Sequence, residues 1–301
     1  MGYIELRNGQ VALRPRKITL TGIDMPSSQV WKSIIYGNGK FVAVTHSSNH
    51  IAAYSEDGIT WATTSMPNTT NNDGYERVTY GGGKFVAVPY SGTIGAYSTD
   101  GITWVEMNMP SSQYWSSIAY GNGKFIAIAS GTSTGAYSTD GINWTEINMP
   151  AYGRWSDVAY GDGKFIAVKY DSTTIGAYST DGITWTTMIM PIAADWNRVT
   201  YGGGKFVAVS VSNDGAYSTD GINWKKMSMP FGYVHSVAYG DGKFVAVAGI
   251  SNIGAYSMNG INWTTMDMPY SVNWLSVTYG NNRFVAVAEG DKAAYFEIKT
   301  N

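Results

Sequence analysis

Short apolar runs alternate with polar turns along the whole chain. In residues 115–150 the runs are WSSIAY, KFIAIAS, TGAYS and INWTEINMP, and Gly, Asn and Asp stand between them. Alternation with a period of two, rich in Val, Ile, Tyr, Phe and Trp, predicts β-strands. No segment has the 3.6-residue periodicity of an amphipathic helix. The pattern therefore predicts an all-β chain of short strands.

The same pattern recurs seven times. The string Tyr-Gly-x-Gly-Lys-Phe, or a close variant, begins 38 to 44 residues apart at Tyr36, Tyr80, Tyr120, Tyr160, Tyr201, Tyr239 and Tyr279. Four strands in a unit of about 40 residues are typical of a propeller blade. We therefore expect a seven-bladed β-propeller of four-stranded blades. The blades are expected at about 31–67, 75–110, 115–150, 155–191, 196–230, 234–269 and 274–298.

The two ends of the chain depart from the repeat in complementary ways. Full units end in Met-Pro, yet an extra Met-Pro closes residues 18–26 before the first unit, and the last unit stops near Ile298 without one. We expect residues 18–26 to be the outer strand of the last blade and to close the ring, because this pairs both chain ends. Residues 1–17 are then an N-terminal hairpin or linker, and the propeller spans 18–301.

Two turns are nearly constant. The Gly-x-Gly turn needs positive φ, and Asn282 is its one substitute for the second glycine. The second turn lies in the phrase Ser-x-Asp-Gly-x-x-Trp, whose Asp or Asn side chain can accept backbone N–H bonds across the turn. We assign these side chains a structural role, at Asp57, Asp100, Asp140, Asp181, Asp220 and Asn259.

This phrase resembles the Asp-box, or BNR repeat, of sialidases and related propellers, although the usual box has one more residue between Asp and Gly. The resemblance implies a turn between the third and fourth strands of a blade, away from the ligand face. The sequence YGNGKFVAV followed by AYSTDGITW is also similar to propeller domains of phage tail and bacterial surface proteins. That resemblance implies a virion, extracellular or cell-surface location and a recognition role, with other subunits of a tail or surface assembly as further partners.

The units differ from each other in two connections. One joins the second strand to the third, and the other joins one unit to the next. In a four-stranded blade both emerge on the same face, and variable loops on a rigid scaffold are where binding sites are usually built. The candidate ligand-binding residues in the first of these loops are Asn49, Tyr90, Asp171, Asn213 and Asn252.

Aromatic residues begin the first strand of most units, next to these loops. Aromatic faces beside polar side chains suit sugar rings, so they are further candidates for binding a glycan. The alternative is that they only seal the contacts between blades. These residues are Trp31, Tyr75, Trp115, Trp155, Trp196 and Trp274.

The composition argues against several classes of partner and cofactor. The net charge is −2 without a basic run, which argues against a nucleic-acid partner. There is no cysteine, no apolar run long enough for a membrane span and no signal-peptide core. We expect no cofactor and no metal, because His46 and His50 share a loop without a third ligand.

We expect a non-catalytic recognition module that binds a cell-surface glycan or receptor through the variable loops. One alternative is a structural or protein-docking propeller. The other is a sialidase-like glycoside hydrolase, for which Arg77, Arg154 and Arg198 would have to converge. The Phe/Tyr-Arg-Ile-Pro motif of sialidases is absent.

Overall fold

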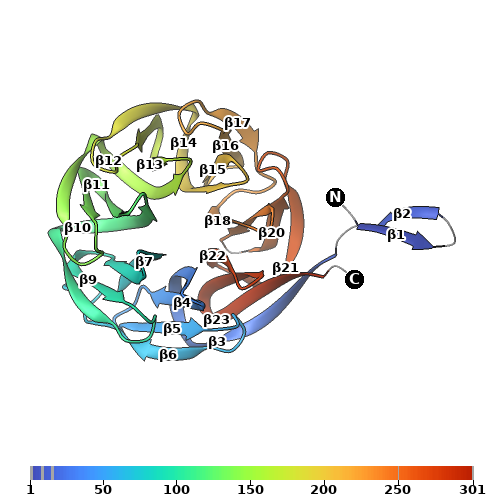
Figure 1. Cartoon of the computed structure of the whole chain (residues 1–301), viewed down its shortest axis with the longest axis horizontal. Coiled ribbons are helices and arrows are strands. Elements are labelled where there is room, and N and C mark those ends of the chain that lie inside the picture. The colour runs from blue at the N-terminus through green and yellow to red at the C-terminus, as the bar shows by residue number, and fades with distance from the viewer. Residues whose placement is uncertain (1–2, 8–9, 15–16, 250, 300–301) are drawn as a thin grey trace.

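A computed structural model describes residues 3–7, 10–14, 17–249 and 251–299, with side chains described for residues 19–249 and 251–296. In these residues the chain folds into strands joined by turns, and no helix occurs among them. From β3 onward the strands lie around a common centre (Figure 1).

The strands follow one another closely along the chain. In order they are β1 (Tyr3–Arg7), β2 (Gln10–Arg14), β3 (Lys17–Gly37), β4 (Lys40–Thr45), β5 (Ile51–Ser55), β6 (Ala62–Ser65), β7 (Tyr75–Gly81), β8 (Lys84–Pro89), β9 (Gly92–Ser98), β10 (Val105–Gly121), β11 (Lys124–Ser138), β12 (Thr145–Gly161), β13 (Lys164–Ser179), β14 (Thr186–Gly202), β15 (Lys205–Ser210), β16 (Asp214–Ser218), β17 (Lys225–Ser228), β18 (Val234–Gly240), β19 (Lys243–Ala248), β20 (Ser251–Ser257), β21 (Thr264–Val272), β22 (Trp274–Gly280) and β23 (Arg283–Lys299).

The expected set of seven separate four-stranded blades in a closed ring is wrong. Apart from the β1–β2 hairpin, the described strands form three open sheets of 11, 4 and 6 strands, and none of these sheets closes on itself. The reason lies in the connections between repeats. Four of them stay extended, within β3, β10, β12 and β14, and the sheets end at the other three, where the strand is interrupted. Strand β10, for example, contains the last strand of one repeat and the first of the next, and it pairs with both β9 and β11.

The two ends of the chain are paired with each other. Strand β3 runs antiparallel to β23, in a register that joins Ile18 to Ile298 and Asp24 to Lys292. Residues 18–26 therefore do lie against the last repeat, as expected. This pairing makes β3 a central strand of the open six-stranded sheet, in the order β22-β23-β3-β4-β5-β6.

The turn after each first strand is a two-residue hairpin loop. At the first of these loops Asn38 has a φ of 46° and Gly39 a φ of 75°, so both central residues are in the left-handed region. Two successive positive φ values define the hairpin turn that matches the twist of the flanking strands. At the last loop the same places are taken by Asn281 and Asn282, with φ values of 43° and 61°.

The Ser-x-Asp-Gly turns are held by short side-chain bonds. In one of them Asp100 Oδ1 accepts the backbone N–H of Ile102 at 2.8 Å and of Thr103 at 2.7 Å, and Ser98 Oγ donates to it at 2.9 Å. Burial alone would raise the pKa of Asp100, but these donors hold it at about 2. The neighbouring hairpin donates to this turn, from Asn38 Nδ2 to Thr99 O at 3.2 Å. The two constant turns therefore lie on the same face of the molecule.

The hydrophobic core lies between repeats. Each buried cluster draws side chains from two adjacent repeats, as where Val42 and Val44 pack with Phe85 and Ala87. The first and last repeats share a cluster in the same way, with Phe41 beside Val285.

Each repeat also places a tyrosine ring directly on a glycine of the preceding one. A Cβ built on Gly121 would lie 2.0 Å from Cγ of Tyr160, so only glycine fits beneath the ring. The same contact recurs in the pairs Gly37–Tyr80, Gly81–Tyr120, Gly161–Tyr201, Gly202–Tyr239, Gly240–Tyr279 and Gly280–Tyr36.

This contact predicts a specific intolerance to one methyl group. Gly121→Ala should lower the free energy of unfolding by about 1–3 kcal/mol, because the new Cβ overpacks against the Tyr160 ring. Gly123→Asn is the control, since Asn282 already occupies the equivalent turn position and nothing lies within 4 Å of an added Cβ. Urea unfolding measures both variants. Equal stability of Gly121→Ala and the wild type would refute the packing role of the glycine.

Candidate functional site

A β-bulge interrupts the first strand of each repeat directly after its buried first residue. In β10 the register shifts between Trp115 and Ser117, which leaves Ser116 as the extra residue. A bulge turns its extra side chain out of the regular alternation. The extra residues, called the bulge residues below, are Lys32, Glu76, Ser116, Ser156, Asn197, His235 and Leu275.

The bulge residues line two adjoining cavities, of about 670 Å³ and 190 Å³. The two share four lining residues, and together we call them the central cavity. The larger is lined by five of the bulge residues and the smaller by four, so every bulge residue faces the central cavity. The shared residues are Lys32, Tyr170, Asn197 and Arg198.

Most bulge side chains are anchored to the next repeat. Ser116 Oγ donates to Trp155 O at 2.6 Å, and Ser156 Oγ donates to Trp196 O at 2.6 Å. Asn197 Nδ2 donates to Val234 O at 2.8 Å. The carbonyl that follows in this series, Trp274 O, lies 3.1 Å from Nδ1 of His235. These bonds fix the cavity wall before any ligand arrives.

A second layer of polar side chains lies beneath the bulge residues. Ser276 Oγ accepts the N–H of Ile34 at 3.2 Å, and Ser236 Oγ accepts the N–H of Val277 at 3.1 Å. Asp157 takes this position in its repeat, where Oδ2 accepts the N–H of Val199 at 2.9 Å and Oδ1 accepts the Ser117 hydroxyl at 2.7 Å.

Asp157 is the most strongly perturbed acid in this layer. Its side chain is only 8% exposed, and the loss of hydration raises its pKa to about 6 despite the opposing charge of Arg77. Arg77 is equally buried, and its NH1 group donates to the carbonyl oxygens of Lys32 and Glu76. The buried layer therefore carries a cation and a carboxylic acid just below the cavity wall.

Aromatic rings form part of the cavity rim. The rings of Tyr90 and Tyr114 lie 5.6 Å apart, and His46 stacks on Tyr90 at 4.2 Å. The guanidinium of Arg154 lies 5.0 Å from the ring of Tyr170. Tyr114 is 59% exposed, so much of its side chain is accessible to a ligand.

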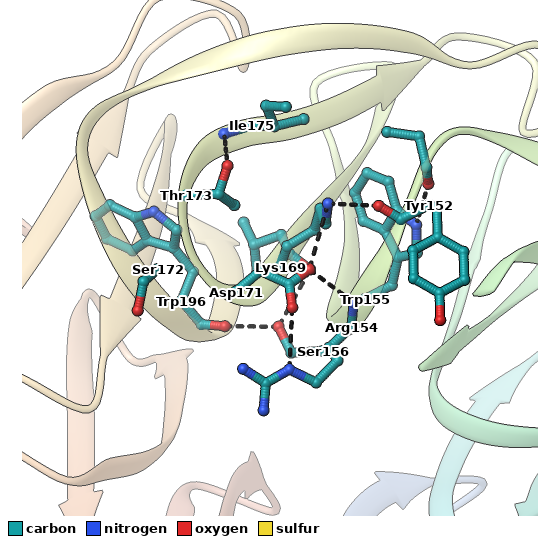
Figure 2. Close-up of polar contacts among 12 residues, drawn as sticks. Tyr152, Arg154, Trp155, Ser156, Lys169, Asp171, Ser172, Thr173, Ile175 and Trp196 are labelled. Atoms are coloured by element: carbon teal, nitrogen blue, oxygen red, sulfur yellow. Dashed lines mark hydrogen bonds and ion pairs between the residues drawn. The ribbon is translucent and has the colours of Figure 1, made fainter. Parts of the chain in front are cut away.

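The loops beside the rim are locked by an ion-pair network (Figure 2). Asp171 Oδ1 accepts from Arg154 Nε at 3.0 Å, and its Oδ2 lies 3.3 Å from Lys169 Nζ. Lys169 is buried and also donates to Tyr152 O at 2.8 Å. The backbone N–H of Arg154 donates to the same carboxylate at 2.8 Å. This bond and the contacts of Lys169 join the loop that contains Asp171 to the connection that contains Arg154.

The tryptophans proposed for sugar stacking are core residues. Trp31, Trp115, Trp155, Trp196, Trp274 and Tyr75 are all 0% exposed. Four of the five indoles also donate their N–H groups to backbone carbonyls, as where Trp155 donates to Ala151 O at 3.0 Å and Trp31 to Ser27 O at 3.2 Å. A ring without accessible surface offers no face to a ligand, so burial argues against a sugar site at these six positions, although Trp115 and Trp155 are among the residues that line the larger cavity. They hold the connections between repeats.

The loop candidates lie in different places. Tyr90 lines the central cavity. Asp171 is beside it and positions Arg154, which does line the cavity. Asn49, Asn213 and Asn252 are exposed but do not line either cavity.

Sequence reasoning missed the bulge residues. Their signal was present, because this position differs in nearly every repeat while the residue before it is almost always aromatic. In a regular strand the position would face away from its neighbours on either side. Only the bulge turns these side chains to a common cavity.

Within the described residues, no group of three or more His, Asp or Glu side chains is arranged to hold a metal ion. In the same part of the chain, no helix has the length and apolarity that a membrane crossing requires.

Comparisons with known proteins identify the fold. Residues 21–151 match the family model of the DUF6242 beta propeller domain, which is less than half of the chain. No protein with a curated description matches the sequence. Among solved structures, virginiamycin B lyase from Staphylococcus aureus superposes with a TM-score of 0.82 at 14% identity, covering 94% of this chain and 100% of that one.

Two further solved structures superpose over most of their length. YCF48 bound to D1 peptide gives a TM-score of 0.73 at 16% identity, covering 93% of this chain and 97% of that one. The WD40 beta propeller domain of Doa1 gives 0.70 at 13% identity, covering 94% and 98%. The chain therefore has an all-β propeller fold. Because this fold occurs both in a lyase and in a protein solved with a bound peptide, it does not decide between catalysis and binding.

The buried Asp157 predicts a pH dependence of stability. Below about pH 3 the acid is protonated in both states, since the pKa of an unfolded aspartate is 3.8. As the pH rises toward 6 the unfolded chain ionises first, so the folded state loses stability. Asp157→Asn lacks this effect, so the wild type should lose roughly 2–3 kcal/mol relative to the variant between pH 4 and 6.5. Urea unfolding across this range measures the difference, and a difference that stays constant or moves in favour of the wild type would contradict the burial effect.

Proposed function

We propose that the chain is a docking propeller whose central cavity receives an exposed segment of a partner polypeptide. The observation that carries this proposal is the gathering of all seven bulge residues on one cavity. The larger part, of about 670 Å³, has the size of a site that encloses a few side chains.

The chemistry of the rim suits a protein partner. Tyr114 and Tyr233 line the cavity and are 59% and 69% exposed. Tyrosine and arginine dominate the energetics of protein interfaces, because they combine large contact area with directed hydrogen bonds. Arg154 and Arg198 line the same cavity. The fold likeness to YCF48, which was solved with a bound peptide, also supports this function.

The proposal replaces glycan binding as the main function, because the aromatic platform expected for sugars has no accessible surface. It also takes the chain as non-catalytic. The hydroxyls of Ser116 and Ser156 donate to backbone carbonyls. No hydroxyl and His among the described cavity-lining residues form the hydrogen-bonded pair that nucleophilic catalysis requires.

Docking predicts that a peptide will bind and that filling the cavity will block it. A random 12-residue peptide library displayed on phage is selected against the full chain. Ser130→Trp places an indole in the larger cavity and should weaken the selected peptides by about tenfold or more, which is 1.4 kcal/mol. Fluorescence anisotropy of the synthetic peptides measures the affinity.

The matched control is Thr139→Trp, an exposed position in the Asp-Gly turn of the same repeat, on the face opposite the cavity. This variant should bind the peptides as the wild type does. Selection of no peptide, or equal loss of binding in both variants, would overturn the docking function. A glycan array run beside the selection identifies a sugar ligand if the polypeptide hypothesis fails.

A further inference from the structure

We infer that the central cavity recognises a single carboxylate on its ligand, with Arg198 as the residue that pairs with it. This inference rests on the proposed docking function and names the chemistry of the docked segment. It is carried by the distribution of charge on the cavity wall and by the way Arg198 is held.

Two of the three cations that line the cavity already have carboxylate partners. Lys32 Nζ lies 3.4 Å from Glu76 Oε1, and Arg154 Nε lies 3.0 Å from Asp171 Oδ1. Among the described residues, no carboxylate oxygen lies within 4 Å of the Arg198 guanidinium. Arg198 lines both parts of the cavity and is half-buried, where water compensates its charge only in part.

Only one side of the Arg198 guanidinium is hydrogen-bonded within the described residues. Its NH1 group donates to Asn197 O at 2.7 Å and to Asn197 Oδ1 at 3.2 Å. Asn197 is itself fixed by its bond to Val234 O at 2.8 Å. The Nε and NH2 groups make no hydrogen bond to any described residue. Two N–H groups on one edge of a guanidinium are the geometry that binds a carboxylate in a bidentate manner.

The amount of charge favours a carboxylate over a phosphate. Among the described residues that line the cavity, one cation has no carboxylate partner, and Glu76 on the same wall repels additional negative charge. A carboxylate carries one negative charge, whereas a phosphate monoester carries nearly two at neutral pH. The carboxylate can come from an Asp or Glu side chain or from a chain terminus, since both present the same group.

Arginine side-chain NMR of the full chain tests the inference. Acetyl-Gly-Glu-Gly-amide should shift the Arg198 Nε–H signal in a saturable way, and acetyl-Gly-Gln-Gly-amide should need about tenfold higher concentration, because it lacks the charge-assisted bond. The signal is assigned by its loss in Arg198→Lys, which should bind the Glu tripeptide with intermediate affinity. Acetyl-Gly-Gly-Gly with a free carboxyl terminus tests the second source of the carboxylate. A response to either carboxylate supports the inference, and the stronger one identifies the source.

A matched pair of variants separates the site from net charge. Arg198→Gln should abolish binding of the Glu tripeptide. Lys205→Gln removes one positive charge from the turn end of the β14–β15 hairpin, whose β14 strand carries Arg198, and should leave binding unchanged. Equal binding of the Glu and Gln tripeptides, a shift confined to Arg154, or tighter binding of a phosphoserine tripeptide would each overturn the inference with the wild-type protein alone.

The outcomes also separate this inference from the docking function. Selected peptides that bind without any carboxylate requirement would refute the inference and leave docking intact. Binding of the tripeptide when no displayed peptide is selected would leave a small-carboxylate site and refute docking.

Discussion

The structure depends on the contact between neighbouring repeats, in which a tyrosine ring lies on a glycine that has no room for a side chain. Seven such contacts join the repeats in order, and the ring of Tyr36 lies on Gly280. They explain why Tyr-Gly is constant in every repeat, including the one whose turn is Asn-Asn. The sheets themselves are open, so side-chain packing, together with the β3–β23 pairing, holds the first repeat against the last.

This packing leaves the bulge residues free to differ. The residue before each bulge is buried and the layer beneath it is bonded across repeats, so the backbone at the bulge is fixed from both sides. Changing the bulge side chain alters the cavity wall without disturbing the core. A rigid scaffold with a variable wall is a suitable basis for recognition of a partner.

Much of the fold could be predicted from the sequence, because its determinants are local. The strand pattern, the positive φ of the hairpin loops and the pairing of residues 18–26 with the last repeat follow from alternation, glycine and the displaced Met-Pro. The sheet boundaries do not follow, because four connections between repeats stay extended and pair with both neighbours whereas the other three are interrupted.

The candidate site was less predictable. Trp115 and its equivalents have the chemistry of a sugar platform, and only their complete burial argues against that role. Ser116 and the other bulge residues become a site only through a register shift, which depends on pairing with a strand many residues away. Arg198 could be noted from sequence, but its lack of a carboxylate partner is a property of the folded cavity.

A crystal structure of the chain with a display-selected peptide tests the central claim most directly. The account predicts electron density for the peptide in the cavity between Tyr170 and Tyr233, with a carboxylate at hydrogen-bond distance from Arg198. A peptide seated against the constant hairpin and Asp-Gly turns on the opposite face, or along an outer edge strand such as β17, would contradict it.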